Sequence, residues 1–450
     1  MRKRRSRRAI YLIAFIALAI AAVLGFKALY NGPLAFAGGS TVALSDYRAA
    51  NPTGVPAELA TADAVKRGEY LARAADCMVC HTAIGGTQYA GGLGIPLPFG
   101  TLYSTNITPD KETGIGGYSD QDFINAVKHG VRRDGVNLYP AMPFTSYGYM
   151  TDADVLAIKA YLFSLPPVHA ANRRDTLAFP YNQRWTMVAW SLMFDTSASF
   201  RPNPERSPEW NRGAYIAEAL AHCGDCHTPR NFAFALDNRR KFAGAVAAGW
   251  RAFNITSEKA TGIGDWSDSD LIAYLSTGHA SGRGTAAGPM GEAVDQSFSR
   301  MAPSDIRALV AYLRSIPAIV SADLPAKLAP PAPPSPKQGG VAAELAGKRV
   351  YESACTGCHG WTGVSEISPF ATISGARAVN DRSAINVAQI VISGTTRSTP
   401  QGALSMPGFG HVYSDVEIAA VANYVTGRFG SAPSAITATD VAALRSQTAR

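Results

Sequence analysis

The fold of this 450-residue chain is decided by three short segments of one pattern: Cys77-Met78-Val79-Cys80-His81, Cys223-Gly224-Asp225-Cys226-His227 and Cys355-Thr356-Gly357-Cys358-His359. Together they contain all six cysteines of the chain. C-x-x-C-H is the attachment pattern of a c-type haem, in which two thiols form thioethers to the porphyrin and the adjacent histidine binds the iron. The sequence therefore predicts three covalent haem c groups. The predicted thioether residues and proximal ligands are Cys77, Cys80, Cys223, Cys226, Cys355 and Cys358, with His81, His227 and His359.

Three other uses of paired cysteines compete with haem attachment. Six cysteines in an exported chain could form three disulfides, but each pair is spaced C-x-x-C and a histidine follows directly. Structural zinc normally takes four Cys or His ligands, and each pair has one adjacent histidine and no second pair nearby. A thioredoxin-like C-x-x-C needs a βαβ context, which the Gly- and Ala-rich surroundings do not supply.

A methionine or a second histidine usually completes the coordination of such an iron. One methionine lies in a Pro- or Gly-containing segment downstream of each motif, and we expect each in a loop before a helix: Met142, Met290 and Met406. Met150 is the alternative to Met142, and Met301 or His279 is the alternative to Met290. Core packing is the usual role of a lone methionine, but the threefold recurrence favours ligation.

The chain also repeats outside the cysteines. Asn106-Ile107-Thr108 recurs as Asn254-Ile255-Thr256 at an offset of 254 − 106 = 148, and either a plain turn or a loop at the haem edge explains it. Short helices are predicted before the motifs, near 67–71, 212–216 and 347–351. Apolar residues at helical spacing predict a closing helix in each copy, around residues 155–162, 306–313 and 418–425, with N-caps at Thr151, Ser304 and Ser414.

These patterns predict an all-α fold of three tandem cytochrome c domains joined by linkers, with an N-terminal transmembrane anchor or signal. The predicted boundaries are a signal anchor at 1–30, domains at 60–166, 208–317 and 341–430, an inter-domain linker at 167–207 and a Pro-rich linker at 318–340. The linker at 167–207 contains an apolar stretch, 185–194, that is short for a membrane span. We expect a helix packed between domains there, with docking on a partner subunit or the membrane surface as the alternative.

The N-terminus combines six cations before residue 9 with an apolar run of 18 residues from Ala9 to Phe26. Because the apolar core of a cleaved signal usually has about 7 to 15 residues, this length favours an uncleaved anchor. The positive-inside rule then places the haem domains on the periplasmic side of the inner membrane. Without these six cations the formal charge falls from +8 to +2, so no nucleic-acid partner is predicted.

The chain resembles the triheme cytochrome c subunits of bacterial membrane-bound dehydrogenases, the family that serves alcohol, gluconate and sorbitol dehydrogenases. The resemblance covers nearly everything after the N-terminal run and rests on residues 77–82, 89–92, 103–110, 139–143 and 223–230. It implies a catalytic partner subunit with flavin or pyrroloquinoline quinone (PQQ). Electrons would pass from that subunit through three haems to membrane ubiquinone or a terminal acceptor. The chain departs from some relatives in its long N-terminal run and in lacking an amphipathic tail after Arg428.

We therefore expect an electron-transfer subunit rather than an enzyme that transforms a substrate. An iron with both axial positions filled has no free position for substrate. Two alternatives stay open. One is the electron-accepting cytochrome subunit of a molybdenum hydroxylase, and the other is a haem enzyme with one open iron, for which the site assigned to Met290 is the candidate.

Overall fold

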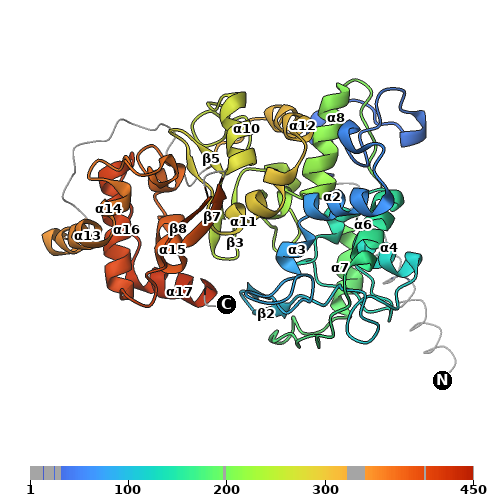
Figure 1. Ribbon diagram of the computed structural model, residues 1–450, viewed down its shortest axis with the longest axis horizontal. Helices are drawn as coiled ribbons and strands as arrows, with labels where there is room; N and C mark the ends of the chain where they lie inside the picture. The colour runs from blue at the N-terminus through green and yellow to red at the C-terminus, as the bar shows by residue number, and fades with distance from the viewer. Residues whose placement is uncertain are drawn as a thin grey trace.

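The computed structural model describes residues 32–195, 199–321, 340–399 and 402–448, together with Ala14 and Gly25. The predicted anchor at 1–30 and most of the predicted Pro-rich linker lie outside these residues. Within the described ranges, no helix is both long and apolar enough to cross a membrane. The described chain is mostly helical, with short antiparallel hairpins between the helices (Figure 1).

The same helix pairing occurs three times along the chain. In each pair an opening helix packs against a closing helix: α2 (Ala64–Ala74) on α6 (Asp152–Ser164), α8 (Pro208–Tyr215) on α12 (Pro303–Arg314), and α13 (Gly340–Ala354) on α16 (Asp415–Phe429). These are the helices predicted at the start and end of each copy, and both sets are confirmed. We refer below to the first, second and third helix pair.

A glycine makes each of these crossings possible. A Cβ atom on Gly68 would lie 1.8 Å from the carbonyl oxygen of Ala157, so only glycine lets the two backbones approach this closely. The other two pairs repeat the arrangement, with 1.9 Å from Gly213 to Ala308 and 2.3 Å from Gly347 to Ala420. A tyrosine, Tyr161, Tyr312 or Tyr424, lies beside the glycine in each case.

Two of the three predicted N-caps are confirmed. The side chains of Thr151 and Ser414 accept hydrogen bonds from the backbone N–H groups three residues on, and Ser414 completes a capping box with Glu417. The prediction for Ser304 is wrong, because α12 begins one residue earlier, at Pro303, and Ala302 occupies the N-cap position. Proline suits this first position, since its missing N–H would be unpaired there anyway.

The first two helix pairs share one buried core, and the third pair has a core of its own. One cluster of buried residues extends from Leu71 to Ile316, and another from Val350 to Leu444. Two reciprocal hydrogen bonds cross the larger cluster: Tyr70 Oη donates to Asp305 at 2.6 Å, and Tyr215 Oη donates to Asp154 at 2.5 Å. Each bond links the opening helix of one pair to the closing helix of the other, as in a symmetric dimer.

The third pair docks on the second through the hairpin of β7 (Thr395–Thr399) and β8 (Gly402–Met406). Arg397 on β7 is buried and donates to three carbonyl oxygens, those of Thr277, Ala286 and Gly291, at 3.1–3.3 Å. It also pairs with Asp295 at 2.9 Å. A buried guanidinium with this many acceptors fixes one orientation, because its planar donors have few other satisfied arrangements.

The remaining elements are short. The helices are α4 (Asp120–His129), α5 (Phe144–Tyr147), α7 (Thr186–Phe194), α10 (Asp268–Thr277), α11 (Gly288–Gln296), α15 (Ile385–Ser393) and α17 (Ala438–Thr448), with a π-helical turn, η4 (Ile216–Leu220), after α8. The strands are β1 (Gly94–Leu97), β2 (Gly100–Tyr103), β3 (Ala245–Ala247), β4 (Trp250–Ala252), β5 (His279–Ala280) and β6 (Gly284–Thr285). The all-α prediction holds for the dominant elements and misses these hairpins.

The apolar stretch in the predicted linker at 167–207 forms α7. Trp190 and Phe194 on this helix are buried with Phe144, which lies before the first closing helix, and with Ala235, which follows the second motif. Trp190 Nε1 also donates to the Ala233 carbonyl at 2.8 Å. The prediction of a helix packed between domains is therefore confirmed for one side of α7.

Candidate haem sites

The three C-x-x-C-H motifs adopt one local structure, a single turn of helix. They form α3 (Cys77–Cys80), α9 (Gly224–His227) and α14 (Thr356–His359). In each motif the histidine N–H donates to the carbonyl oxygen of the first cysteine, at 3.1, 3.0 and 2.9 Å in chain order. None of the six cysteines is bonded to another cysteine, so the alternative of three disulfides is wrong.

Each motif histidine is held by one ring nitrogen. His81 Nδ1 lies 2.7 Å from the Thr105 carbonyl oxygen, His227 Nδ1 lies 2.6 Å from that of Phe253, and His359 Nδ1 lies 2.6 Å from that of Ala371. Because a carbonyl oxygen can only accept, Nδ1 carries a proton, and in the neutral form of such a ring Nε2 has the free lone pair. Haem ligation needs this tautomer and a ring fixed in orientation.

Burial favours the neutral form of two of these rings. The pKa values of His81 and His227 are lowered by burial, and the hydrogen bonds to Thr105 and Phe253 oppose this effect only in part. A neutral imidazole is the form that binds a metal. These two motif histidines therefore have the protonation state and the free nitrogen that an iron ligand requires.

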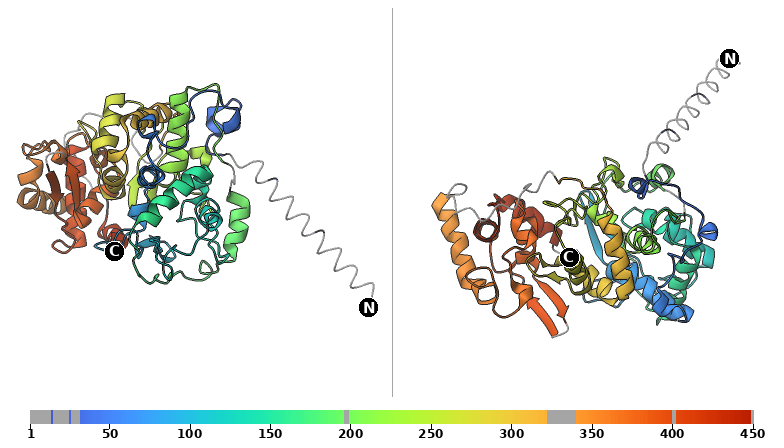
Figure 2. Two further views of the ribbon diagram at one scale, coloured as in Figure 1. Left: turned by 45° about the vertical axis from the view of Figure 1, so that its right-hand side comes forward. Right: turned by 90° about the horizontal axis from the view of Figure 1, so that it is seen from above.

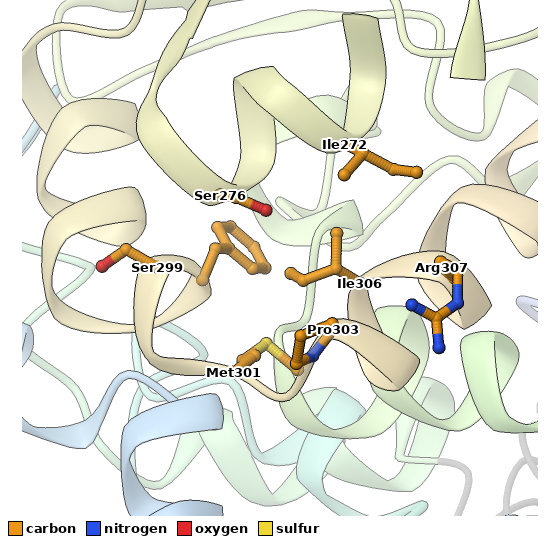
Figure 3. Close-up of a pocket in the computed structure, with 8 residues that line it drawn as sticks. Ile272, Ser276, Ser299, Met301, Pro303, Ile306 and Arg307 are labelled. Carbon is orange, nitrogen blue, oxygen red and sulfur yellow. The ribbon is translucent and has the colours of Figure 1, made fainter. Parts of the chain in front are cut away.

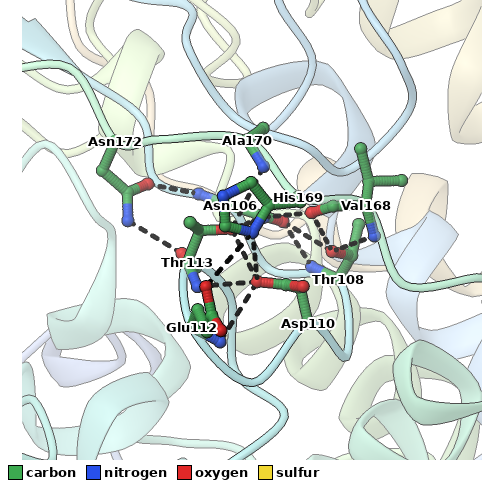
Figure 4. Close-up of polar contacts among 9 residues, drawn as sticks. All are labelled: Asn106, Thr108, Asp110, Glu112, Thr113, Val168, His169, Ala170 and Asn172. Atoms are coloured by element: carbon green, nitrogen blue, oxygen red, sulfur yellow. Dashed lines mark hydrogen bonds and ion pairs between the residues drawn. The ribbon is translucent and has the colours of Figure 1, made fainter.

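The Asn-Ile-Thr repeat holds the carbonyl that orients the first histidine. Asn106 follows Thr105, and its side-chain oxygen accepts from the N–H and hydroxyl of Thr108 at 2.9 and 2.7 Å (Figure 4). Its amide nitrogen donates to Thr113 Oγ1 at 2.9 Å and to the Val168 carbonyl at 2.7 Å. Residues 106–108 thus form a turn that begins directly after Thr105, the residue whose carbonyl oxygen holds His81.

The second copy repeats this network almost atom for atom. Asn254 follows Phe253, accepts from Thr256 at 2.9 and 2.7 Å, and donates to Thr261 Oγ1 at 3.1 Å and to the Ile319 carbonyl at 2.6 Å. The repeat is therefore a turn that begins beside the carbonyl group holding a motif histidine, and its place at a haem edge stays a prediction.

Burial also affects the motif thiols. It raises the pKa of Cys77 and Cys223 to about 12 and that of Cys355 to about 11. Burial thus disfavours the thiolate form of these side chains, which is the form that zinc binding requires. Among the described residues, no group of three or more His, Cys, Asp or Glu side chains could hold a metal ion. A thioether has no charge, so covalent haem attachment suits these environments.

The three candidate distal methionines all lie at the margin of a core. Met142 and Met290 are partly buried against the larger cluster, and Met406 against the smaller one. Met142 lies in the bend before α5, as predicted. Met290 lies inside the first turn of α11, and Met406 is the last residue of β8, so the prediction of a loop is wrong at both positions.

The alternatives for distal ligation lie elsewhere. Met150 is fully buried, and Met301 is nearly so. Both occupy the second position before a closing helix. Met301 lines a cavity of about 230 Å³ with Phe298 and Ile306, and none of the residues that line it belongs to a motif (Figure 3). These placements match core packing. His279 lies on β5, where Nδ1 bonds Thr285 at 2.9 Å and the ring packs against Phe370.

One side chain that sequence reasoning missed bridges the first two motifs. Tyr147 Oη donates to the carbonyl of Ala75, two residues before Cys77, at 2.6 Å. Its ring meets that of His222, the residue before Cys223, edge to face at 5.4 Å. Neighbouring Ser146 donates to Asp225 inside the second motif at 3.0 Å. The first two motifs are therefore joined through α5.

Other missed residues are buried polar groups. Lys241 and Glu218 form a buried ion pair at 2.6 Å near the second motif. The Tyr–Asp bonds between the first two pairs had a signal in the sequence, because Tyr70 and Tyr215 differ by 215 − 70 = 145 positions and Asp154 and Asp305 by 305 − 154 = 151. These offsets are close to the 148 of the Asn-Ile-Thr repeat. Arg397 had no such signal.

Comparison with known proteins agrees with this geometry. The cytochrome c family profile matches residues 65–166, and a profile described as cytochrome C oxidase, cbb3-type, subunit III matches residues 342–425. The chain is 36% identical over 420 residues to the fructose dehydrogenase cytochrome subunit of Gluconobacter japonicus, covering 88% of this chain and 85% of that protein. It is 37% identical over 404 residues to the gluconate 2-dehydrogenase cytochrome c subunit of Pantoea cypripedii, covering 85% and 89%.

A further relative is larger than this chain. The chain is 40% identical over 376 residues to a subunit of the nicotinate dehydrogenase of Pseudomonas putida. That match covers 82% of this chain and 30% of the relative.

Proposed function

Since the chain belongs to the cytochrome c subunits of membrane-bound dehydrogenases, which transfer electrons for a catalytic subunit, we propose that it relays electrons through three covalent haems c. The haems attach at Cys77 and Cys80, at Cys223 and Cys226, and at Cys355 and Cys358. The observation that carries the proposal is the threefold recurrence of one turn with a histidine held at Nδ1.

We assign six axial ligands to the three irons. The proximal ligands are His81, His227 and His359, and the distal ligands are Met142, Met290 and Met406. The positions of Met150 and Met301 in the core support this choice, because a distal ligand must lie next to the space that the porphyrin fills. A haem with both axial positions occupied exchanges electrons and leaves no iron position open for substrate.

The contacts between the units support a relay in the order of the sequence. Tyr147 bridges the residues before the first two motifs. Ala371, whose carbonyl oxygen holds His359, directly follows Phe370. The carbonyl oxygen of Phe370 accepts a hydrogen bond from Thr285 of the second copy at 2.9 Å. Neighbouring repeats therefore contact one another, beside the motifs of the first two and beside the orienting carbonyl of the third, and these contacts support a relay between successive haems. Electron entry at one end and exit at the other would follow from this arrangement.

The electron donor in this proposal is a periplasmic dehydrogenase subunit with flavin or PQQ, and the acceptor is ubiquinone in the inner membrane. The chain would be held there by its N-terminal run, with the tandem haem domains at 60–166, 208–317 and 341–430 on the periplasmic side. The similarity to fructose and gluconate dehydrogenase cytochrome subunits supports this partner class.

A second candidate donor has an observation in its favour. The relative from Pseudomonas putida is named for nicotinate, an N-heterocycle, which is a substrate class of molybdenum hydroxylases. Purification of the native complex from membranes distinguishes the two donors. Flavin or PQQ in a complex that contains no molybdenum, with reoxidation of its reduced haems by added ubiquinone, supports the proposal. Molybdenum in a complex that oxidises N-heterocycles supports the alternative, and haems that ubiquinone does not oxidise contradict the assigned acceptor.

A further inference from the structure

Helix α7 has an apolar side that no part of the described chain covers. Trp185, Val188 and Leu192 follow one another at helical spacing and are 72%, 48% and 61% exposed. No charged residue occurs from Thr186 to Phe194. Figure 2 shows α7 at the outer edge of the fold in its left view. Single exposed apolar residues are ordinary, but an uncharged helix with an exposed apolar stripe marks an interaction surface.

Segments that precede α7 or contact it also expose aromatic rings. Phe179 precedes α7 and is 79% exposed, and Phe232 is 94% exposed in the loop whose Ala233 carbonyl accepts from Trp190. Tyr181 stacks on Phe99 at 3.9 Å between ring centroids and is itself exposed. We call the six residues Phe179, Tyr181, Trp185, Val188, Leu192 and Phe232 the α7 surface.

The course of the chain places this surface near its N-terminal apolar run. Pro33 lines the same small pocket as Trp190 and Phe194, which lie on the buried side of α7. The apolar run ends at Phe26, so only residues 27–32 separate it from this point. The seven Cα steps from Phe26 to Pro33 span at most about 25 Å when fully extended. If the run lies in a bilayer, α7 lies within that reach of the lipid surface.

We infer that the α7 surface is a second membrane contact, in which α7 lies in the plane of the bilayer interface. This inference rests on the proposed membrane location only through the N-terminal run. Tryptophan and tyrosine prefer the headgroup region, where their rings are shielded from water and their polar atoms are not. Helix α7 has nine residues, too few to span a bilayer, so an orientation in the interface plane is the one that buries its stripe. Two contacts on one side would fix the tilt of the haem domains over the membrane.

Engineered cysteines test the inference in the full-length holoprotein. In the proposal all six native cysteines are thioethers, so Val188→Cys and Val416→Cys each introduce one reactive thiol. Both positions are exposed helix residues, and Val416 lies on α16 in the third helix pair. The proteins are placed in vesicles of phosphatidylethanolamine and phosphatidylglycerol and treated with a charged maleimide. We expect the thiol of the Val188→Cys variant to react at least tenfold more slowly than that of the Val416→Cys variant.

A second measurement uses the native sequence. A photoactivatable phospholipid in the same vesicles should crosslink to peptides that contain residues 185–192 and not to peptides that contain Val416. Equal alkylation rates, or no crosslink to α7, would overturn the inference. Protection of the thiol at position 188 that arises only after a catalytic subunit is added would overturn it in favour of a protein interface. The haem content of the same samples is counted separately, so failure of the proposed function is read independently.

Discussion

Replacing Asn106 by alanine should loosen one haem site and leave its twin intact. The Asn106 side chain makes four hydrogen bonds of 2.7–2.9 Å, and the residue is buried. Each such bond contributes about 0.5–1.5 kcal/mol net, and the buried partners left unpaired add to the loss. Allowing for partial rearrangement, we expect the local free energy of opening to fall by roughly 2–4 kcal/mol.

Hydrogen exchange read by mass spectrometry measures this opening directly. At about 1.36 kcal/mol for each tenfold change, amide exchange over residues 104–116 should become roughly 30-fold to several hundred-fold faster. Asn254→Ala removes the corresponding four bonds from the second copy and should speed exchange over residues 252–264 alone. Because Thr105 and Phe253 orient His81 and His227, each variant should also shift the reduction potential of its own haem only.

Gln121→Ala is the matched control. It removes one exposed side-chain hydrogen bond, to Asn125, and should change stability by no more than about 0.5 kcal/mol. If Asn106→Ala exchanged no faster than this control, the turn would not support the histidine. If both asparagine variants loosened both loops equally, the two copies would not be independent sites, and the reasoning would be refuted.

Three further perturbations test the rest of the structure. Gly213→Ala should destabilise the protein by about 1–3 kcal/mol in chemical denaturation, because the new Cβ atom would lie 1.9 Å from the Ala308 carbonyl oxygen. The control is Gly427→Ala in a helix, where no atom lies closer than 3.6 Å to the new Cβ atom, so this change should be neutral or stabilising. Arg397→Gln should release the third helix pair and speed its proteolytic removal, whereas Arg239→Gln, which breaks an exposed pair with Asp237, should leave digestion unchanged. Burial, with the nearby Glu292 carboxylate, raises the pKa of Asp76 to about 7. Because the folded protein disfavours the charged form of this carboxyl group, the stability of the protein falls as pH rises from about 4 to about 7. Asp76→Asn should therefore stabilise the protein at pH 8 by at most about 4 kcal/mol and change little at pH 4; a variant that is equally stabilised at both values would contradict the assignment.

The parts of this structure that sequence predicts are the local ones. A C-x-x-C-H motif occupies five consecutive residues, so it can be recognised without any knowledge of tertiary contacts. The closing helices were predictable because their buried residues recur at helical spacing, as with Ile418, Val421 and Val425. Their crossing with the opening helices depends on glycines whose role only the packed structure reveals.

The errors arise where short signals have two meanings. Gly288-Pro289 looks like a loop, yet proline is also favoured in the first turn of a helix, and α11 begins there with Met290 inside it. The hairpins have strands of two to five residues, too short for an alternating pattern to show. The docking of the third helix pair gave no readable pattern, because Arg397 belongs to the third repeat and is buried against residues of the second.

The central claim, an electron carrier with three haems, is tested most directly by the visible spectrum of the purified protein. Haem staining and a reduced-minus-oxidised spectrum count the covalent haems. The thioether-to-iron charge-transfer band in the far red and a carbon monoxide titration report their ligands. We predict three covalent haems, all ligated by methionine and none binding carbon monoxide. Fewer than three haems, or one that binds carbon monoxide, would contradict the claim and direct attention to an open iron at the site assigned to Met290.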